Sequence, residues 1–307
     1  MDTPRLPKLK ARKIDGHKGT FGTVGIFGGS NGDAQSQQPR MIGAPALVAM
    51  AANRAGCGLI KIAAPDSILS AVLTLAPMAT GFPYISEEEQ SAVLDRMSME
   101  CDVLVVGPGL GTGADIQRFI ASVTTLTADN QCKYLVLDAD ALNALCTLEP
   151  FPTRFTLPTI LTPHPGEAQR LLDALDIDHN PAGNASQRSL ACRSIAERLH
   201  CIVVLKGMHT VVSDGHREWV CQHGHPCLST GGTGDVLAGM IGSLVAQCLN
   251  NPDVDDFGVA CIAVDTHARC GEVWSQRHNA DAGLDPRDLM PLIPELLQRF
   301  RNLPLPR

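Results

Sequence analysis

The chain lacks the features that mark several large classes of protein. Its 307 residues include only 4% aromatic side chains and have a net charge of −7, from 25 basic and 32 acidic residues. Nucleic-acid-binding proteins need a basic surface and often stack bases on aromatic rings, so this composition argues against that class. No segment approaches about 18 uninterrupted apolar residues, and no apolar stretch follows the N-terminal methionine, so we expect neither a membrane span nor a secretory signal.

Motifs of several familiar nucleotide and metal sites are also missing. The chain has no Gly-Lys dipeptide, hence no P-loop, and no predicted strand ends in a G-x-G-x-x-G fingerprint. None of its eleven cysteines forms a C-x-x-C pair, and several lie in apolar runs, so we expect buried free thiols in a reducing cytoplasm. His209, His216, His223 and His225 lie close in sequence, but no cysteine partner has suitable spacing, which argues against zinc.

What the chain does contain is a regular alternation of short apolar runs and helix-length segments. The runs are β-branched and nearly continuous, as in strands covered on both faces, and lie at 23–29, 59–64, 102–107, 134–138, 159–162 and 201–205. Helices are expected at 43–55, 114–126, 166–175, 186–200, 233–249, 256–275 and 285–300, with an edge hairpin at 210–220. This order predicts an α/β fold with a mainly parallel sheet and helices on both sides.

Chemically reactive or glycine-rich segments follow five of the predicted strands. In open parallel sheets ligands bind beyond the carboxyl ends of the strands, so segments at those ends meet in one site. The five segments are 28–32 (GGSNG), 107–111 (GPGLG), 138–143 (DADALN), 162–167 (TPHPGE) and Lys206-Gly207. Their expected convergence is a stronger indication of a site than any single segment.

The segment Gly231-Gly232-Thr233-Gly234-Asp235 leads into an apolar helix that we expect to end near Cys248. A helix start leaves N–H groups unpaired and has the positive end of the helix dipole, so it attracts phosphate. An acid there suits proton removal from a hydroxyl about to be phosphorylated, which makes Asp235 a candidate general base. The alternative is a tight turn in which Thr233 caps the helix and Asp235 complements its dipole.

The remaining polar segments each have two interpretations. Asp138 and Asp140 either cap a helix or provide oxygen ligands for Mg²⁺. His164 is oriented rigidly between two prolines, which suits a ligand contact, although most lone histidines are structural or solvated. Glu167 either orients a hydrated metal or complements a helix dipole. The segment 206–210 is either a hairpin over a nucleotide or an ordinary turn.

Taken in order, these motifs resemble the ADP/ATP-dependent NAD(P)H-hydrate dehydratases of the ribokinase-like superfamily, related to the carbohydrate-kinase domain of YjeF-type proteins. The resemblance covers about residues 12–300 and also includes 17–19, Gly43-Ala44 and 54–58. TPHPGE and DADALN are specific to this branch, whereas GTGD is shared with sugar, vitamin and thiazole kinases. The resemblance implies one three-layer α/β/α domain over residues 1–307.

Two departures from the family pattern lie where we expect the mouth of the site. Residues 33–40 are an extra polar insertion, and His225-Pro226-Cys227-Leu228 stands where relatives more often have Asn-Pro and small residues. Neither departure touches the core motifs. We expect no epimerase domain of the kind that some relatives have, because no room remains before Pro7 or after Leu303.

The resemblance also implies a substrate, a cosubstrate and residue roles. The S-form of NADHX or NADPHX would be phosphorylated on its C6 hydroxyl by ADP or ATP with Mg²⁺, and phosphate elimination would restore NADH or NADPH. Asp235 would be the catalytic base, and the amides of Gly232, Thr233 and Gly234 would form an anion hole. The hydrate would contact Ala44, Gly109, His164 and Asp235. The nucleotide would contact Lys206, Gly207, Met208, His209, Thr210 and Gly234. Relatives often form tetramers, so we expect a cytoplasmic homo-oligomer.

Two other functions fit the same residues. A kinase of this superfamily that acts on a hydroxymethylpyrimidine, a thiazole or a sugar would use Asp235 in the same way, but TPHPGE and DADALN favour the dehydratase. A nucleotide sensor without catalysis would have no need of a base at Asp235.

Overall fold

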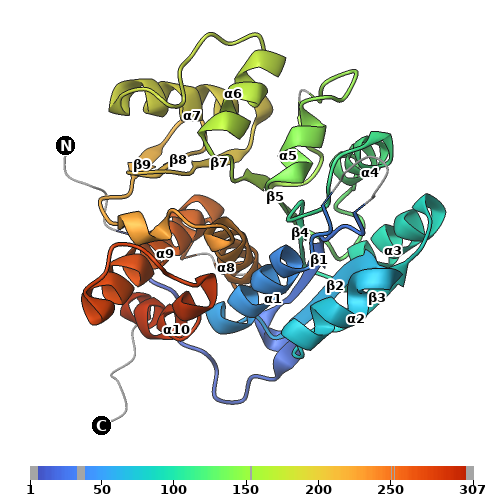
Figure 1. Cartoon of the computed structure of the whole chain (residues 1–307), viewed down its shortest axis with the longest axis horizontal. Coiled ribbons are helices and arrows are strands. Elements are labelled where there is room, and N and C mark those ends of the chain that lie inside the picture. Colours follow the sequence, from blue (N-terminus) through green and yellow to red (C-terminus); the bar gives the residue numbers. More distant parts are fainter. Residues whose placement is uncertain (1–5, 33–38, 153, 250, 252, 302–307) are drawn as a thin grey trace.

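The structure is a computed structural model that describes residues 6–32, 39–152, 154–249, 251 and 253–301. Within these residues nine strands form one sheet in the order β3-β2-β1-β4-β5-β6-β7-β8-β9 (Figure 1). Strands β1 to β7 pair in parallel, and β8 and β9 add antiparallel at one edge. The strands are β1 Thr23–Phe27, β2 Leu59–Pro65, β3 Thr80–Tyr84, β4 Val103–Val106, β5 Tyr134–Leu137, β6 Thr159–Leu161, β7 Ile202–Leu205, β8 Val211–Ser213 and β9 Glu218–Val220.

Helices cover both faces of the sheet, and their buried side chains fall into two separate apolar clusters. One face has α1 Gly43–Ala55, α2 Asp66–Leu75, α8 Thr233–Cys248, α9 Asp256–His278 and α10 Leu292–Leu297. The other has α3 Glu87–Glu100, α4 Ala114–Thr124, α5 Asp140–Leu145, α6 Pro165–Ala174 and α7 Ala185–Leu199. Short 3₁₀ turns are η1 Lys18–Phe21, η2 Pro226–Leu228, η3 Pro286–Leu289 and η4 Gln298–Phe300. The predicted mainly parallel α/β/α fold is confirmed.

The differences from the predicted elements lie at one edge of the sheet and in the C-terminal helical segment. Strand β3 and the helices α2 and α3 were not predicted. The strand was missed because it contains Gly81 and Pro83, which are rare inside strands. Proline is tolerated there because β3 lies at the edge of the sheet and, among the strands described, pairs with β2 alone. The expected helix at 285–300 was wrong. Pro291 interrupts it as the N-cap of α10, so that η3, α10 and η4 follow one another.

The sheet has a topological switch point between β1 and β4. The chain leaves β1 toward β2 and β3, then returns to β4 on the other side, and ligand sites form where neighbouring connections diverge in this way. The turns after the two strands touch, since the Gly29 amide donates to the Pro108 carbonyl at 3.0 Å. Residues 33–38 of the expected insertion lie outside the described residues. In the part that is described, no helix combines the length and apolar character needed to cross a membrane.

Gly107 is required by this packing, which gives a first prediction. Its φ is +127°, and a Cβ there would lie 1.8 Å from the Asp138 carbonyl oxygen. We therefore expect Gly107→Ala to lower the free energy of unfolding by about 3 kcal/mol or to prevent folding, because the strand end must move. Gly43→Ala is the control, since a Cβ at Gly43 has nothing within 4 Å. Denaturant unfolding measures both, and equal midpoints for the two variants would contradict the packing argument.

Candidate active site

The start of α8 has free backbone donors. Gly232 is the N-cap, with φ 95° and ψ −14°, and no side chain in the described residues caps the helix. The Thr233 hydroxyl instead donates to the carbonyls of Leu228 and Thr230, at 2.8 and 3.0 Å. The alternative in which Thr233 caps the helix is therefore wrong, while the predicted end of the helix at Cys248 is confirmed. Uncapped first-turn N–H groups are suited to an anion.

Asp235 lies in the first turn of α8, half-buried and within electrostatic reach of three charged side chains. Burial raises the pKa of Asp235 to about 7, the charges of Asp138 and Asp140 raise it as well, and Lys206 opposes the rise. A carboxyl group whose pKa lies near the working pH is suited to accept and release a proton. The electrostatics of this residue thus agree with the predicted general base.

Lys206 follows β7, and its side chain contacts carboxylates that follow β5 and β6 in the chain. Its Nζ lies 2.6 Å from Asp138 Oδ1 and 3.9 Å from Glu167 Oε2, and both carboxylates are buried. The Thr162 hydroxyl donates to the same Asp138 oxygen at 2.7 Å. Burial works to lower the pKa of Lys206, but the two carboxylates raise it overall, so the ammonium group stays charged. A fixed cation therefore lies at the carboxyl edge of the sheet.

His164 is the N-cap of α6 and forms a capping box with Glu167. Its Nδ1 accepts from the amides of Gly166 and Glu167, at 2.9 and 3.2 Å, and Glu167 Oε2 accepts from the His164 amide at 2.7 Å. Burial and the neighbouring Lys206 lower the pKa of His164, so the imidazole is neutral at neutral pH. Its side chain remains 52% exposed. His164 therefore has a structural role as a helix cap, with its Nε2 3.3 Å from Glu167 Oε1, and its contact with a ligand stays a prediction.

The glycine turn after β4 lies against α1 and α5. A Cβ on Gly109 would lie 3.3 Å from the Ala44 Cβ, so these two predicted hydrate contacts are brought together. The Gly111 amide donates to Asp140 Oδ2 at 2.8 Å, and burial raises the pKa of Asp140. Asp140 in turn acts electrostatically on Asp235. The predicted site residues thus form one connected group at the carboxyl edge of the sheet.

The predicted hairpin between β7 and β8 is confirmed. The Thr210 hydroxyl donates to the Gly207 carbonyl at 2.9 Å and closes the turn, while the Met208 side chain is 83% exposed. A Cβ on Gly234 would lie 3.5 Å from Lys206 Nζ, so the first residue of the hairpin meets the start of α8. The structure therefore brings the two parts of the predicted nucleotide site together.

Sequence reasoning missed two side chains that hold the backbone of this region. Arg188 of α7 donates to the carbonyls of Leu205 and Lys206, at 3.3 and 3.2 Å. His267 of α9 hydrogen-bonds to the Thr233 backbone, and burial lowers the pKa of His267 to about 4, so the ring is neutral. Both residues lie inside amphipathic helices and outside any motif, so no local signal distinguishes them from other helix positions.

The carboxylates of this region suit a metal ion that binds together with the phosphates of a nucleotide. Among the residues described, no three or more His, Cys, Asp or Glu side chains are grouped to hold an ion. Asp138 and Glu167 already pair with Lys206, and Asp140 accepts from Gly111. Mg²⁺ usually keeps several waters and needs only one or two carboxylates when phosphate oxygens supply the rest. This region therefore suits a nucleotide-bound Mg²⁺ better than a metal held by protein ligands alone.

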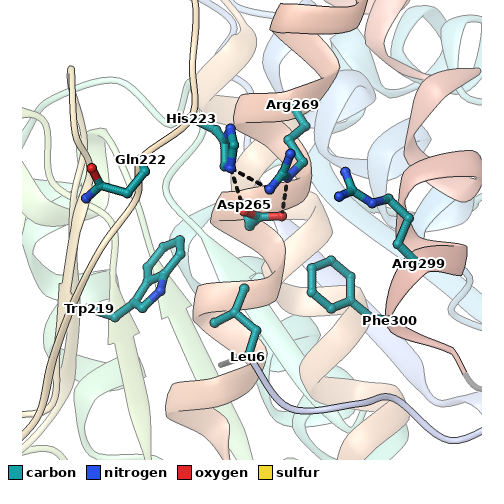
Figure 2. Close-up of a pocket in the computed structure, with 8 residues that line it drawn as sticks. All are labelled: Leu6, Trp219, Gln222, His223, Asp265, Arg269, Arg299 and Phe300. Atoms are coloured by element: carbon teal, nitrogen blue, oxygen red, sulfur yellow. Dashed lines mark hydrogen bonds and ion pairs between the residues drawn. The ribbon is translucent and has the colours of Figure 1, made fainter. Parts of the chain in front are cut away.

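A separate cavity of about 370 Å³ lies between β9, α9 and the C-terminal segment (Figure 2). His223 contacts the Arg269 guanidinium there, and its Nδ1 lies 3.2 Å from Glu272 Oε1. Arg269 Nε lies 2.8 Å from Asp265 Oδ2, which completes a charged network on one side of α9. None of the predicted catalytic or binding residues lines this cavity, so it is distinct from the candidate active site.

Comparisons with known proteins agree with this geometry. A family model described as NAD(P)H-hydrate dehydratase matches residues 36–295. The chain is 37% identical over 292 residues to the ADP-dependent (S)-NAD(P)H-hydrate dehydratase of Neisseria meningitidis, covering 94% of this chain and 89% of that protein. It is 35% identical to the bifunctional NAD(P)H-hydrate repair enzyme of Gloeobacter violaceus, but spans only 52% of that protein's length.

A solved structure shows the same fold. The ADP/ATP-dependent NAD(P)H-hydrate dehydratase of Bacillus subtilis, co-crystallised with ATP and Mg²⁺, superposes with a TM-score of 0.73 at 27% identity and covers 95% of each chain. The fold is therefore the ribokinase-like α/β/α fold of that enzyme. From the family match and the identity to the relatives together, the chain belongs to the NAD(P)H-hydrate dehydratase family.

Proposed function

We propose that this chain dehydrates the S-form of NADHX and NADPHX back to NADH and NADPH, using ADP or ATP as phosphoryl donor. The observation that supports this most strongly is the position of Asp235, in the first turn of an uncapped helix and close to the charged Lys206. Phosphoryl transfer needs these two elements side by side, namely a base for the hydroxyl and donors for the phosphate. The named relatives act on the same class of substrate.

In the proposed reaction Asp235 accepts the proton of the C6 hydroxyl group, while the oxygen of that hydroxyl attacks the terminal phosphorus of the nucleotide. General-base assistance of this kind is worth about 10²–10⁴-fold in rate. The amides of Gly232, Thr233 and Gly234 stabilise the charge on the transferred phosphoryl group. Bond cleavage at phosphorus leaves AMP from ADP, or ADP from ATP, and a phosphorylated hydrate.

The second half of the reaction removes the phosphate. The ring nitrogen of the hydrate donates its electron pair, the bond from C6 to oxygen breaks and inorganic phosphate leaves. Loss of a proton from C5 then restores the dihydropyridine. Ala44, Gly109 and His164 would hold the hydrate. The reacting ring of the hydrate is uncharged, so the neutral imidazole of His164 suits it better than a protonated imidazole would.

Nucleotide binding is assigned to the hairpin and the start of α8. The phosphates would lie between Lys206 and Gly234, and the exposed turn of Gly207, Met208, His209 and Thr210 would contact the rest of the nucleotide. Bound Mg²⁺ would offset charge on the phosphates, with Asp138, Asp140 and Glu167 placed to contact its waters. We also propose that the chain forms one ribokinase-like domain and assembles as a homo-oligomer in the cytoplasm. Light scattering would measure the mass of the oligomer.

The experiment that tests this function compares substrates. The protein is incubated with Mg²⁺, ADP or ATP, and either NADHX or one of a set of alcohols (hydroxymethylpyrimidine, hydroxyethylthiazole, sugars), and nucleotide consumption is measured. Of these candidate substrates, we expect only NADHX to cause nucleotide consumption, with one inorganic phosphate released for each nucleotide consumed. Removal of Mg²⁺ by EDTA should abolish the reaction. A stable phosphorylated alcohol formed while NADHX remains would instead support the kinase. Tight nucleotide binding without turnover, unchanged by Asp235→Asn, would support the sensor.

A further inference from the structure

The loop that leads into the proposed anion hole is exposed, so its position depends on the residues at its two ends. Ser229, Thr230 and Gly231 are all exposed, and a Cβ on Gly231 would have nothing within 4 Å beyond its chain neighbours. Leu228 and Thr233 bound the loop, and the Thr233 hydroxyl donates to the Leu228 carbonyl at 2.8 Å. Whatever fixes this pair therefore also fixes the amides of the anion hole.

Helix α9 contacts both members of the pair. It packs beside α8 and against η2 (Figure 1). His267 of α9 hydrogen-bonds to the Thr233 backbone. Gly271 lies one turn further along, and a Cβ there would lie 2.6 Å from Leu228 Cγ, so Leu228 packs directly on the helix backbone. Residues four apart lie on the same face of a helix, so a single face of α9 holds both ends of the loop.

The next residue on this face, Ser275, holds η2, the turn that comes just before the loop. His225 caps η2, since its Nδ1 accepts from the Cys227 amide at 3.4 Å, and its Nε2 lies 3.1 Å from Ser275 Oγ. Because Nδ1 accepts, the ring proton is on Nε2, which donates to Ser275. The Cys227 thiol donates to the Gly271 carbonyl at 3.3 Å. Two side chains of η2 thus attach it to α9.

His225 belongs to a segment that departs from the family pattern, and the expectation that this segment leaves the core motifs untouched was wrong. The Leu228 carbonyl, at its end, bonds Thr233 of GTGD. An asparagine, more usual in relatives at this place, would cap η2 with its side-chain oxygen. It is shorter than histidine and would not reach Ser275 from the same position while it caps. The attachment to α9 is therefore what the histidine adds.

From these contacts we infer that His267, Gly271 and Ser275 form a support that sets the position of the anion hole, and that His225, through Ser275, is a positioning residue for phosphoryl transfer. None of these four side chains needs to touch the substrate. They act through the Leu228 carbonyl and the Thr233 backbone, which bound the loop. The inference rests on the proposed function, because it assigns positioning residues for the same reaction.

The test measures kcat and KM of variants with NADHX, Mg²⁺ and saturating ADP or ATP. Gly271→Ala should lower kcat by about 10–100-fold, because its methyl group displaces Leu228 and a shift of about 1 Å in a reacting group can cost this much. His225→Asn and Ser275→Ala should each lower kcat by about fivefold, the ratio equivalent to one hydrogen bond. The double variant should lose no more than either single variant, because both substitutions remove the same bond.

Three further measurements separate positioning from a general loss of stability. KM for NADHX should change little, because loss of an interaction made in the transition state lowers kcat and leaves KM. Ile120→Val, in the apolar cluster on the other face of the sheet, should destabilise the protein without changing kcat. Ser122→Ala removes a hydroxyl that donates to the Arg118 carbonyl on the exposed side of α4, and kcat should not change. His225→Ala, which also loses the cap of η2, should have a lower kcat than His225→Asn.

The outcomes distinguish this inference from the function on which it rests. If the wild-type protein turns over NADHX and the losses at His225 and Ser275 are additive, the inference is overturned and the dehydratase stands. The same holds if kcat of Gly271→Ala and His225→Asn equals that of Ile120→Val. Absence of NADHX turnover by the wild-type protein would overturn the proposed function, and the inference with it.

Discussion

Replacement of Asp235 by asparagine is expected to lower kcat by about 10²–10⁴-fold while the protein stays folded. Asparagine keeps the shape of the side chain and cannot accept the hydroxyl proton. The wild-type enzyme should lose kcat/KM as the pH falls through about 7, because the raised pKa of Asp235 means that the base becomes protonated there. Steady-state kinetics between about pH 5 and pH 9 measure both effects.

The same substitution should stabilise the protein at alkaline pH. The pKa of Asp235 rises from an ordinary 3.8 to about 7 in the folded protein, so folding favours the protonated carboxyl group. The stability that this group contributes is complete below pH 3.8 and is lost as the pH rises through 7. Thermal unfolding should therefore give Asp235→Asn a higher Tm than wild type above pH 7. The exposed Asp281→Asn serves as the control, and a lower Tm for Asp235→Asn at every pH would contradict this assignment.

Replacement of Lys206 by methionine should strongly destabilise the folded protein. It leaves the buried carboxylates of Asp138 and Glu167 without their cation, and removal of one partner from a buried ion pair costs about 3–5 kcal/mol. Denaturant unfolding at neutral pH measures this loss. Part of it should return as the pH is lowered, because unpaired buried carboxylates then take up protons.

The matched control is an exposed ion pair. Lys10 Nζ lies 3.2 Å from Asp253 Oδ2, and their side chains are 57% and 66% exposed, so Lys10→Met should cost no more than about 1 kcal/mol. If Lys206→Met proved as mild as this control, Lys206 would not be the cation that the two buried carboxylates need.

The strands and the site motifs were predictable because their signals are local. A continuous β-branched run specifies a buried strand, and the glycine and carboxylate segments that follow such runs meet for topological reasons alone. The edge strand β3 was not predictable, since Gly81 and Pro83 suppress the signal and only its position at the edge makes them tolerable.

The parts of the site that were missed depend on tertiary contacts. Whether Thr233 caps α8 depends on two carbonyls, those of Leu228 and Thr230, which its hydroxyl bonds instead. Arg188 and His267 act on the site from helices distant in sequence, and their roles follow from packing that no local pattern describes. The raised pKa of Asp235 likewise requires burial and neighbours that only the fold supplies.

The central claim is best tested by following the return of the reduced nicotinamide. The protein is mixed with NADHX, Mg²⁺ and ADP or ATP, and the near-ultraviolet absorbance of the dihydropyridine is recorded together with released phosphate. The account predicts that absorbance recovers with one phosphate for each NADH formed, and that Asp235→Asn shows almost no recovery. No recovery by the folded wild-type protein with either nucleotide would contradict it.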